Sequence, residues 1–254
     1  MSAKLRDLRM LFIFLIAIGM QLIFNLLTLA RILLRNSYFT FNLAACLLTF
    51  CLVVLFIKLE HGKFKEHGFC LSRNVGGAFS ISLLLAVISV IVNVFILGSI
   101  TNFEAFPQPA LSYGLFTEIF VIFITNIAIE ALFRGYLQIK LKKLIGFPYA
   151  LLVSSVMSTL YISLLLLNSE VRLQLTILLP NLLTNFAKSC FLGVLFNKTR
   201  TLLSPIVFSA GLSIFYLITP LKVLAPEYLV LMVSTATYAF LVLLLQLSAE
   251  EEII

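Results

Sequence analysis

Long apolar runs constrain the fold of this sequence more than any other feature. Each is long enough to cross the roughly 30 Å hydrocarbon core of a bilayer as a helix. The chain is 61% hydrophobic and only 11% charged, with a mean hydropathy of +1.12. So few charges cannot cover the surface of a water-soluble globule of this length. The eight runs are residues 9–30, 40–59, 76–98, 113–137, 148–168, 173–196, 202–219 and 227–247.

These runs predict an all-α, polytopic integral membrane protein with about eight transmembrane helices, in a single membrane domain over residues 1–254. The Lys and Arg residues between the runs predict the orientation. With the N-terminus inside, the inside segments hold twelve of them and the outside segments four. We therefore expect both termini in the cytoplasm.

The formal net charge of +7 does not indicate nucleic-acid binding, because the basic residues are dispersed between apolar runs. That distribution is typical of topology determinants in a membrane protein. We expect membrane lipids to surround the chain and no nucleic acid to bind it.

The fourth run carries polar side chains at membrane depth, where each charge is costly and needs a reason. At about 100° per residue, four of them fall within one half of the helix. We therefore expect this half to face the protein interior or an interface. The acid precedes the base in an i,i+4 pair, which is the favourable order. The four residues are Glu118, Asn126, Glu130 and Arg134.

The sixth run also has a polar face, made by Asn181, Asn185 and Lys188, and it contains Pro180. We expect this helix to be kinked or to lie inside the bundle. One reading of the two polar faces is an active or binding site between the fourth and sixth helices. The other is a buried ion-pair and amide network that locks helices together. The spacing alone leaves both open.

Both histidines, His61 and His67, lie in the polar loop after the second run. A catalytic metal site at membrane depth needs ligands such as imidazole nitrogens and a carboxylate that activates water. Because no predicted span carries a histidine, we expect no metal and no cofactor.

Four stretches, in order, resemble the CPBP family of CAAX prenyl endopeptidases and bacteriocin-processing enzymes, also called Abi. Residues 130–137 (EALFRGYL) resemble its first motif, Glu-Glu-x-x-x-Arg, and residues 66–71 (EHGFCL) its loop before the third helix. Residues 154–161 (SSVMSTLY) resemble its second motif, Phe-x-x-x-His. Residues 193–213 resemble its last Gly…Pro…His-x-x-x-Asn segment. The resemblance covers roughly residues 60–220 and implies a bundle around an intramembrane cavity.

The departures from these motifs concern the catalytic positions. The water-activating Glu of active members falls on Ile129, while the second Glu and the Arg are kept as Glu130 and Arg134. The histidine of the second motif falls on Tyr161. The histidine and the Asn of the last motif fall on Ser209 and Ser213. Isoleucine cannot accept a proton, and Ser and neutral Tyr are poor zinc ligands.

We therefore expect a non-catalytic family member, a pseudoprotease in the cytoplasmic membrane of a Gram-positive bacterium. The resemblance implies a partner or regulator of another membrane or envelope protein, such as a peptidoglycan enzyme or sensor kinase, or a bacteriocin immunity factor. One alternative is an active intramembrane CAAX-type endopeptidase with a rearranged site. A second alternative is a small transporter or lipid-binding protein, for which the polar stripe is the support.

Overall fold

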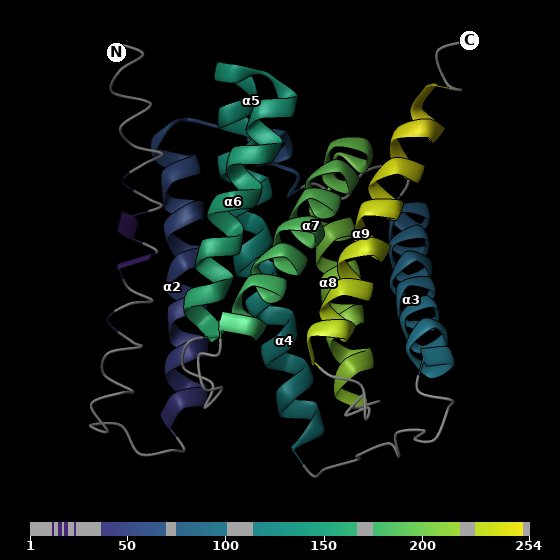
Figure 1. Cartoon of the computed structure of the whole chain (residues 1–254). Coiled ribbons are helices and arrows are strands. Elements are labelled where there is room, and N and C mark those ends of the chain that lie inside the picture. The colour runs from purple at the N-terminus through teal and green to yellow at the C-terminus, as the bar shows by residue number, and fades with distance from the viewer. Residues whose placement is uncertain are drawn as a thin grey trace.

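The computed structural model describes residues 37–69, 75–100, 114–166, 175–218 and 227–250, with six isolated positions between residues 12 and 23. In this part of the chain the regular structure is helical throughout, and the long helices form one bundle (Figure 1). The elements are α2 (Ser37–Leu59), η1 (Phe64–His67), α3 (Val75–Ile100), α4 (Leu115–Glu130), η2 (Ala131–Gln138), α5 (Ile139–Ile145), α6 (Phe147–Leu166), α7 (Leu175–Thr199), α8 (Leu203–Ile218) and α9 (Glu227–Glu250).

Seven of the apolar runs coincide with described helices, six of them closely, and the first run lies outside the described residues apart from the isolated positions. Three helical stretches are long and apolar enough to cross a membrane by length and composition: Val75–Ile96, Leu115–Ile145 and Leu178–Thr199. Four further apolar helices are shorter. Large apolar side chains are exposed on the bundle, including Phe95 and Phe116. Such a surface suits lipid and indicates a multi-pass membrane protein, while the count of eight spans and the orientation stay predictions.

The helix formed by the fourth run is longer than the apolar pattern predicted. The helix that begins at Leu115 continues through η2 and α5 to Ile145, eight residues beyond the predicted end at residue 137. Lysine is a good helix former, so the charged turn after residue 138 does not end the helix. Gly146 ends it instead, with φ +80 and ψ 168, a backbone conformation that is essentially restricted to glycine.

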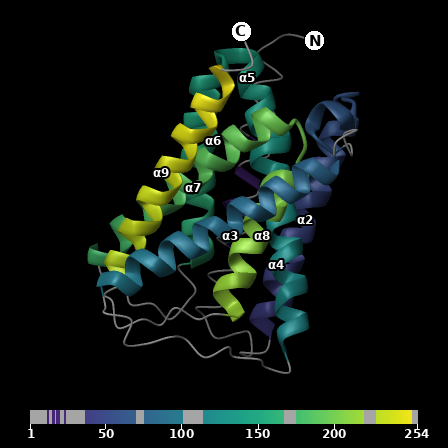
Figure 2. The ribbon, with the colours of Figure 1, turned by 90° about the vertical axis from the view of Figure 1, so that its right-hand side faces the viewer.

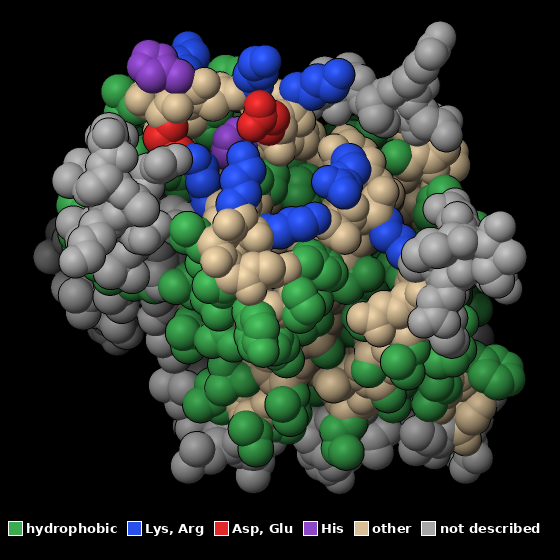
Figure 3. All heavy atoms as spheres, turned by 90° about the horizontal axis from the view of Figure 1, so that it is seen from above, with side chains coloured by type: hydrophobic (Ala, Val, Ile, Leu, Met, Phe, Trp, Pro, Cys, Tyr) green, Lys and Arg blue, Asp and Glu red, His purple; other side chains and the backbone are tan. Residues whose placement is uncertain are grey.

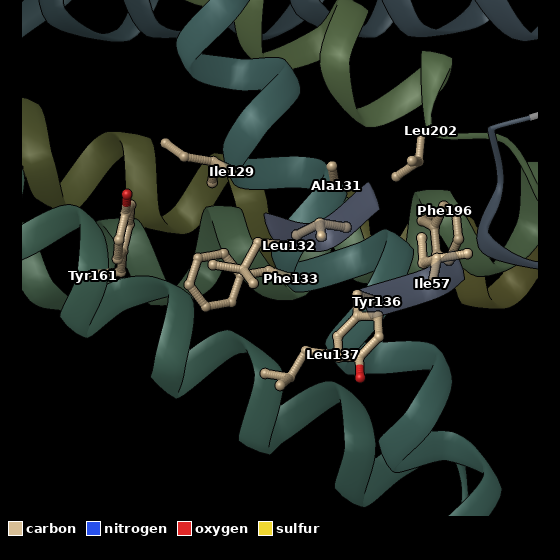
Figure 4. Packing of buried hydrophobic residues seen from close by; sticks show 11 residues of the cluster. Ile57, Ile129, Ala131, Leu132, Phe133, Tyr136, Leu137, Tyr161, Phe196 and Leu202 are labelled. Carbon is tan, nitrogen blue, oxygen red and sulfur yellow. The ribbon is translucent and has the colours of Figure 1, made fainter. Parts of the chain in front are cut away.

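Two apolar clusters hold the bundle together. The first lies where α2, α4, η2, α6 and the end of α7 meet, and it includes Ile57, Phe133 and Tyr161 (Figure 4). The second joins α3, α7, α8 and α9 around Phe191 and Phe208. Helix α7 packs against α6, α8, α9 and η2, so it lies inside the bundle as its polar face predicted (Figures 1 and 2).

Two polar contacts lie within the apolar helices. Asn93 of α3 is fully buried, and its Oδ1 accepts a hydrogen bond from Thr237 Oγ1 of α9 at 3.3 Å. Such hydrogen bonds between polar side chains join helices within a membrane. Pro180 is accommodated within α7, where its carbonyl oxygen accepts a hydrogen bond from Thr184 Oγ1 at 2.8 Å.

The loop around η1 docks on the outside of η2. His67 Nδ1 lies 2.6 Å from the carbonyl oxygen of Gly135, and the His67 ring stacks on Tyr136. Because a carbonyl only accepts, Nδ1 must carry the proton in this contact. The hydroxyl of Tyr136 donates to Glu60 Oε1 at 2.8 Å. The loop therefore braces the helical segment that carries Arg134.

This contact predicts a pH-dependent stability. Burial lowers the pKa of the His67 imidazole below its usual value of 6.5; the Gly135 hydrogen bond opposes this, and Lys140 and Lys143 lower it further. Below about pH 6.5 the unfolded chain therefore binds a proton that the folded chain does not, and stability falls as the pH falls. Thermal unfolding in detergent between pH 5 and 8 should show a smaller decline for His67→Gln than for the wild type. His61→Gln, at the exposed histidine, should keep the wild-type decline, and an equal decline in all three would contradict this role.

Candidate functional site

The site is built on a π-helical segment. In η2 the backbone winds with i→i+5 hydrogen bonds, and all eight of its residues are buried. Such wider turns occur mostly as short insertions in α-helices and are frequent at functional sites. Arg134 lies in the middle of the segment and is only 1% exposed. A buried guanidinium needs several partners, because each unmet N–H group carries the cost of its desolvation.

Arg134 finds its partners on two other helices. Its Nη1 donates to Ser158 Oγ of α6 at 3.1 Å. Its Nη2 donates to both the carbonyl oxygen and Oγ of Ser189 on α7, each at 2.7 Å. The guanidinium therefore ties η2 to α6 and α7 at the centre of the bundle.

The predicted pair of Glu130 and Arg134 is formed. Arg134 Nε lies 3.3 Å from Glu130 Oε2, and both side chains are almost fully buried. Neither of these two atoms meets hydrogen-bond geometry with any described group, so the contact is chiefly electrostatic. The ammonium of Lys188, on α7, also interacts electrostatically with Glu130. One carboxyl group thus lies near two basic side chains.

These groups border a small cavity of about 30 Å³. That volume has room for about two water molecules. Ser209 Oγ of α8 is buried at its wall and makes no hydrogen bond to a described group. The lining residues come from α4, η2, α6, α7 and α8: Asn126, Ile129, Glu130, Arg134, Ser158, Ile162, Asn185, Lys188, Ser189, Leu192 and Ser209.

The residues that line this cavity lie within the part of the chain that matches a family model. Residues 111–215 match the model of the Type II CAAX prenyl endopeptidase Rce1-like family. The match covers less than half of the chain, beginning before α4 and ending within α8, and includes every residue that lines the cavity. It supports the resemblance for three of the four stretches, while residues 66–71 lie outside it. No curated protein matches the chain.

The four motif positions of the Rce1-like segment do not meet at one point. Ile129 and Ser209 line the cavity. Tyr161 packs in the first apolar cluster instead, with its ring centroid 5.6 Å from that of Phe133 (Figure 4). Its hydroxyl interacts with the side chain of Thr49 on α2. Ser213 lies outside the cavity lining, and its Oγ donates to the Ser209 carbonyl oxygen at 2.9 Å.

Of the other predicted polar residues, some line the cavity and others lie outside it. Asn126, Asn185 and Lys188 line the cavity beside the ion pair. Asn181 lies one turn away, and its Oδ1 accepts a hydrogen bond from Asn185 Nδ2 at 2.7 Å. The two polar faces, on α4 and α7, therefore do meet within the Rce1-like segment.

Glu118 does not face the interior of the described bundle, because its side chain is exposed, so the alternative that it faces an interface stays a prediction. It lies in the first turn of α4, which begins at Leu115. A carboxylate is favoured there, since the unpaired N–H groups and the helix dipole make a helix N-terminus positive. Glu118 thus has a local reason for its place and is not part of the cavity.

Sequence reasoning missed the two serines that bind Arg134. Ser158 lies within residues 154–161, and Ser189 directly follows Lys188, so both were adjacent to residues that were singled out. The hydroxyl of a serine in an apolar helix can donate its hydrogen bond to a backbone carbonyl one turn earlier in the same helix, as Ser82 Oγ does to the Ala78 carbonyl oxygen. The sequence gives no signal that separates the two kinds of serine.

The cavity does not fit a catalytic zinc ion. Such a site uses three protein ligands drawn from imidazole, thiolate and carboxylate groups. Among the described residues that line the cavity, Glu130 is the one carboxylate and no imidazole is present. No group of three or more His, Cys, Asp and Glu side chains suited to a metal occurs in the described part of the chain. The Arg134 and Lys188 cations would also repel a divalent metal ion.

Proposed function

We propose that this chain is a non-catalytic Rce1-like membrane protein that acts as a partner or regulator of another envelope protein in a bacterial cytoplasmic membrane. The observation that carries this proposal is the size of the cavity at Glu130, about 30 Å³. Sites for small molecules commonly measure about 300–1,000 Å³. A cavity of this size admits water but not a peptide.

The chemistry of the cavity wall supports the same conclusion. Ile129 stands where the resemblance puts the water-activating Glu, and its side chain cannot accept a proton. The carboxylate of Glu130 faces Arg134, which is bonded in turn to two other helices. In this proposal the polar centre is a structural lock, and recognition of a partner takes place elsewhere on the molecule. A peptidoglycan enzyme, a sensor kinase and a bacteriocin target, as for an immunity factor, are the partners that the resemblance suggests.

A peptidase assay tests the non-catalytic assignment. The purified chain in liposomes, incubated with farnesylated CAAX peptides, is expected to release no product above the rate of empty liposomes. Glu130→Gln should give the same result as the wild type. An active Rce1-like endopeptidase in the same liposomes is the positive control. Product released by the wild type and lost in Glu130→Gln would overturn the proposal.

The role as a partner is tested by capture. Cross-linking in native membranes, followed by purification of the chain, is expected to recover one envelope protein reproducibly and near equal stoichiometry. An unrelated polytopic protein of similar abundance, treated in parallel, removes proteins that co-purify with any membrane protein. Recovery of the same set of proteins from both would count against this role.

The second candidate is an active endopeptidase with a rearranged site. The observation that favours it is the meeting of Glu130, Lys188 and Ser209 around a space large enough for water. In that reading Glu130 is the general base, and the bundle opens to admit a peptide. The Glu130→Gln arm of the peptidase assay decides between the two candidates.

A further inference from the structure

A second pocket, lined by basic residues, lies at the end of the bundle where α5 and α7 terminate. Its volume is about 530 Å³, within the range of ligand-binding sites. Seen from this end, Lys and Arg side chains gather on the surface (Figure 3). The cations that line the pocket come from three separate segments, the η1 loop, α5 and the end of α7: Lys65, Lys142, Lys143 and Arg200.

The positive charge of this basic pocket is largely uncompensated. Glu66 is its one acidic lining residue, and it makes a long, exposed ion pair of 3.6 Å with Lys143. Lys142 Nζ donates to the neutral amide oxygen of Asn197 at 2.7 Å and interacts repulsively with Arg200. In the described segments, no carboxylate lies within ion-pair distance of Lys65, Lys142 or Arg200. An anion in the pocket would relieve this repulsion.

The backbone at Arg200 adds an independent observation. This residue has φ +56, the left-handed conformation in which helices commonly end on glycine. For a residue with a Cβ, this conformation is strained. An arginine is nevertheless placed there, directly after α7, with its side chain at the wall of the basic pocket. The strained backbone at this position therefore carries a guanidinium, the side chain best suited to bind phosphate.

The position of the pocket identifies the source of the anion. The helical stretch Leu115–Ile145 has 31 residues, roughly 45 Å of helix, so it extends beyond a hydrocarbon core of about 30 Å. Its last turns, which carry Lys142 and Lys143, therefore reach the level of lipid headgroups. Leu144 and Tyr149 are exposed beside them, as is usual for side chains at this depth. Basic pockets between spanning helices at this level are suited to anionic lipid headgroups.

We propose that the basic pocket binds the phosphate of an anionic phospholipid headgroup. Lys142 and Arg200 flank the phosphate from α5 and α7, and Lys65 closes the site from the η1 loop. The buried amide of Gln138 and the ring of Phe196 also line the pocket and offer a polar and an apolar contact to the glycerol part. This site is separate from the cavity at Glu130, so its test does not depend on the proposed function.

The test titrates the purified full chain in neutral detergent with phosphatidylglycerol or phosphatidylcholine and counts bound lipid by native mass spectrometry. The wild type should bind phosphatidylglycerol and not phosphatidylcholine. Lys142→Gln/Arg200→Gln should weaken phosphatidylglycerol binding roughly thirtyfold, given about 1 kcal/mol per basic residue near a headgroup. Lys58→Gln/Lys63→Gln, which removes the same charge from exposed positions outside the pocket, should weaken it less than about threefold.

Arg200→Gly keeps the proposal testable if the double variant folds poorly. Glycine relieves the left-handed strain, so thermal stability should rise while phosphatidylglycerol binding weakens. Three results would overturn the proposal: equal lipid binding by the wild type and both pocket variants, displacement of the lipid by an equal concentration of inorganic phosphate, or displacement by an equal concentration of a Glu-rich peptide. The second would assign the pocket to a soluble phosphate, and the third to an acidic protein segment.

Discussion

Glu130→Ala is expected to lose about 3–5 kcal/mol of stability, the usual result of removing one partner from a buried ion pair. The loss follows from the charges that stay behind, because Arg134 and Lys188 would then share the cavity without a carboxylate. The three hydrogen bonds from Arg134 to Ser158 and Ser189 would remain, but they do not neutralise the charge. Thermal unfolding in detergent and the folded yield after size-exclusion chromatography measure the effect.

Glu118 offers a matched control in the same helix. It is also a glutamate, but it is exposed in the first turn, where a favourable dipole contact is worth about 0.3–1 kcal/mol. Glu118→Ala should therefore cost no more than that amount. If Glu130→Ala were as stable as Glu118→Ala and yet lost its partner in the capture experiment, the carboxylate would have a recognition role and not a structural one.

The apolar runs predicted the helices well because the breaks between them are local. Gly146 interrupts the pattern where the backbone turns between α5 and α6, and most described helices begin and end within about three residues of the predicted bounds. The end of the fourth run was misjudged because Lys140, Lys142 and Lys143 are polar yet strongly helix-forming. Hydropathy reports burial in lipid and does not report where a helix stops.

The polar centre could be predicted only in part. Helical spacing placed Glu130 and Arg134 together because both lie on one continuous helix. It could not place Tyr161, since neighbouring positions on α6 face different helices: Ser158 turns to the cavity and Tyr161 to α2. That division depends on how α6 is rotated in the bundle, which packing determines and sequence spacing does not.

The basic pocket could not be predicted from the sequence. Its cations were counted as topology determinants between the predicted spans. The pocket arises because the η1 loop, α5 and the end of α7 converge at one end of the bundle. Residues that lie more than a hundred positions apart share it, as Lys65 and Arg200 do.

Gly68→Ala is the second change with a large expected effect, a loss of about 2–5 kcal/mol. Gly68 has φ +76, where a residue with a Cβ is disfavoured by about 1–2 kcal/mol. A Cβ there would also lie 2.6 Å from Cε2 of Phe196 and 3.2 Å from the backbone nitrogen of Leu202. That nitrogen donates to the Gly68 carbonyl oxygen at 3.0 Å, so it cannot withdraw without losing the bond. Overpacking of this kind adds about 1–3 kcal/mol.

His61 allows the effect of backbone strain to be measured separately from the effect of steric crowding. It lies in the same loop with φ 53 but is exposed. The residue therefore has the backbone strain of a left-handed conformation without steric crowding of its side chain. His61→Gly should therefore stabilise the fold by about 1 kcal/mol, while Gly68→Ala should destabilise it by more than that amount, both measured by thermal unfolding in detergent. The additional destabilisation in Gly68→Ala measures how tightly the η1 loop packs on Phe196 and Leu202. Effects of equal size and opposite sign would mean that the loop is held by backbone conformation alone, and that its packing does not brace the segment carrying Arg134.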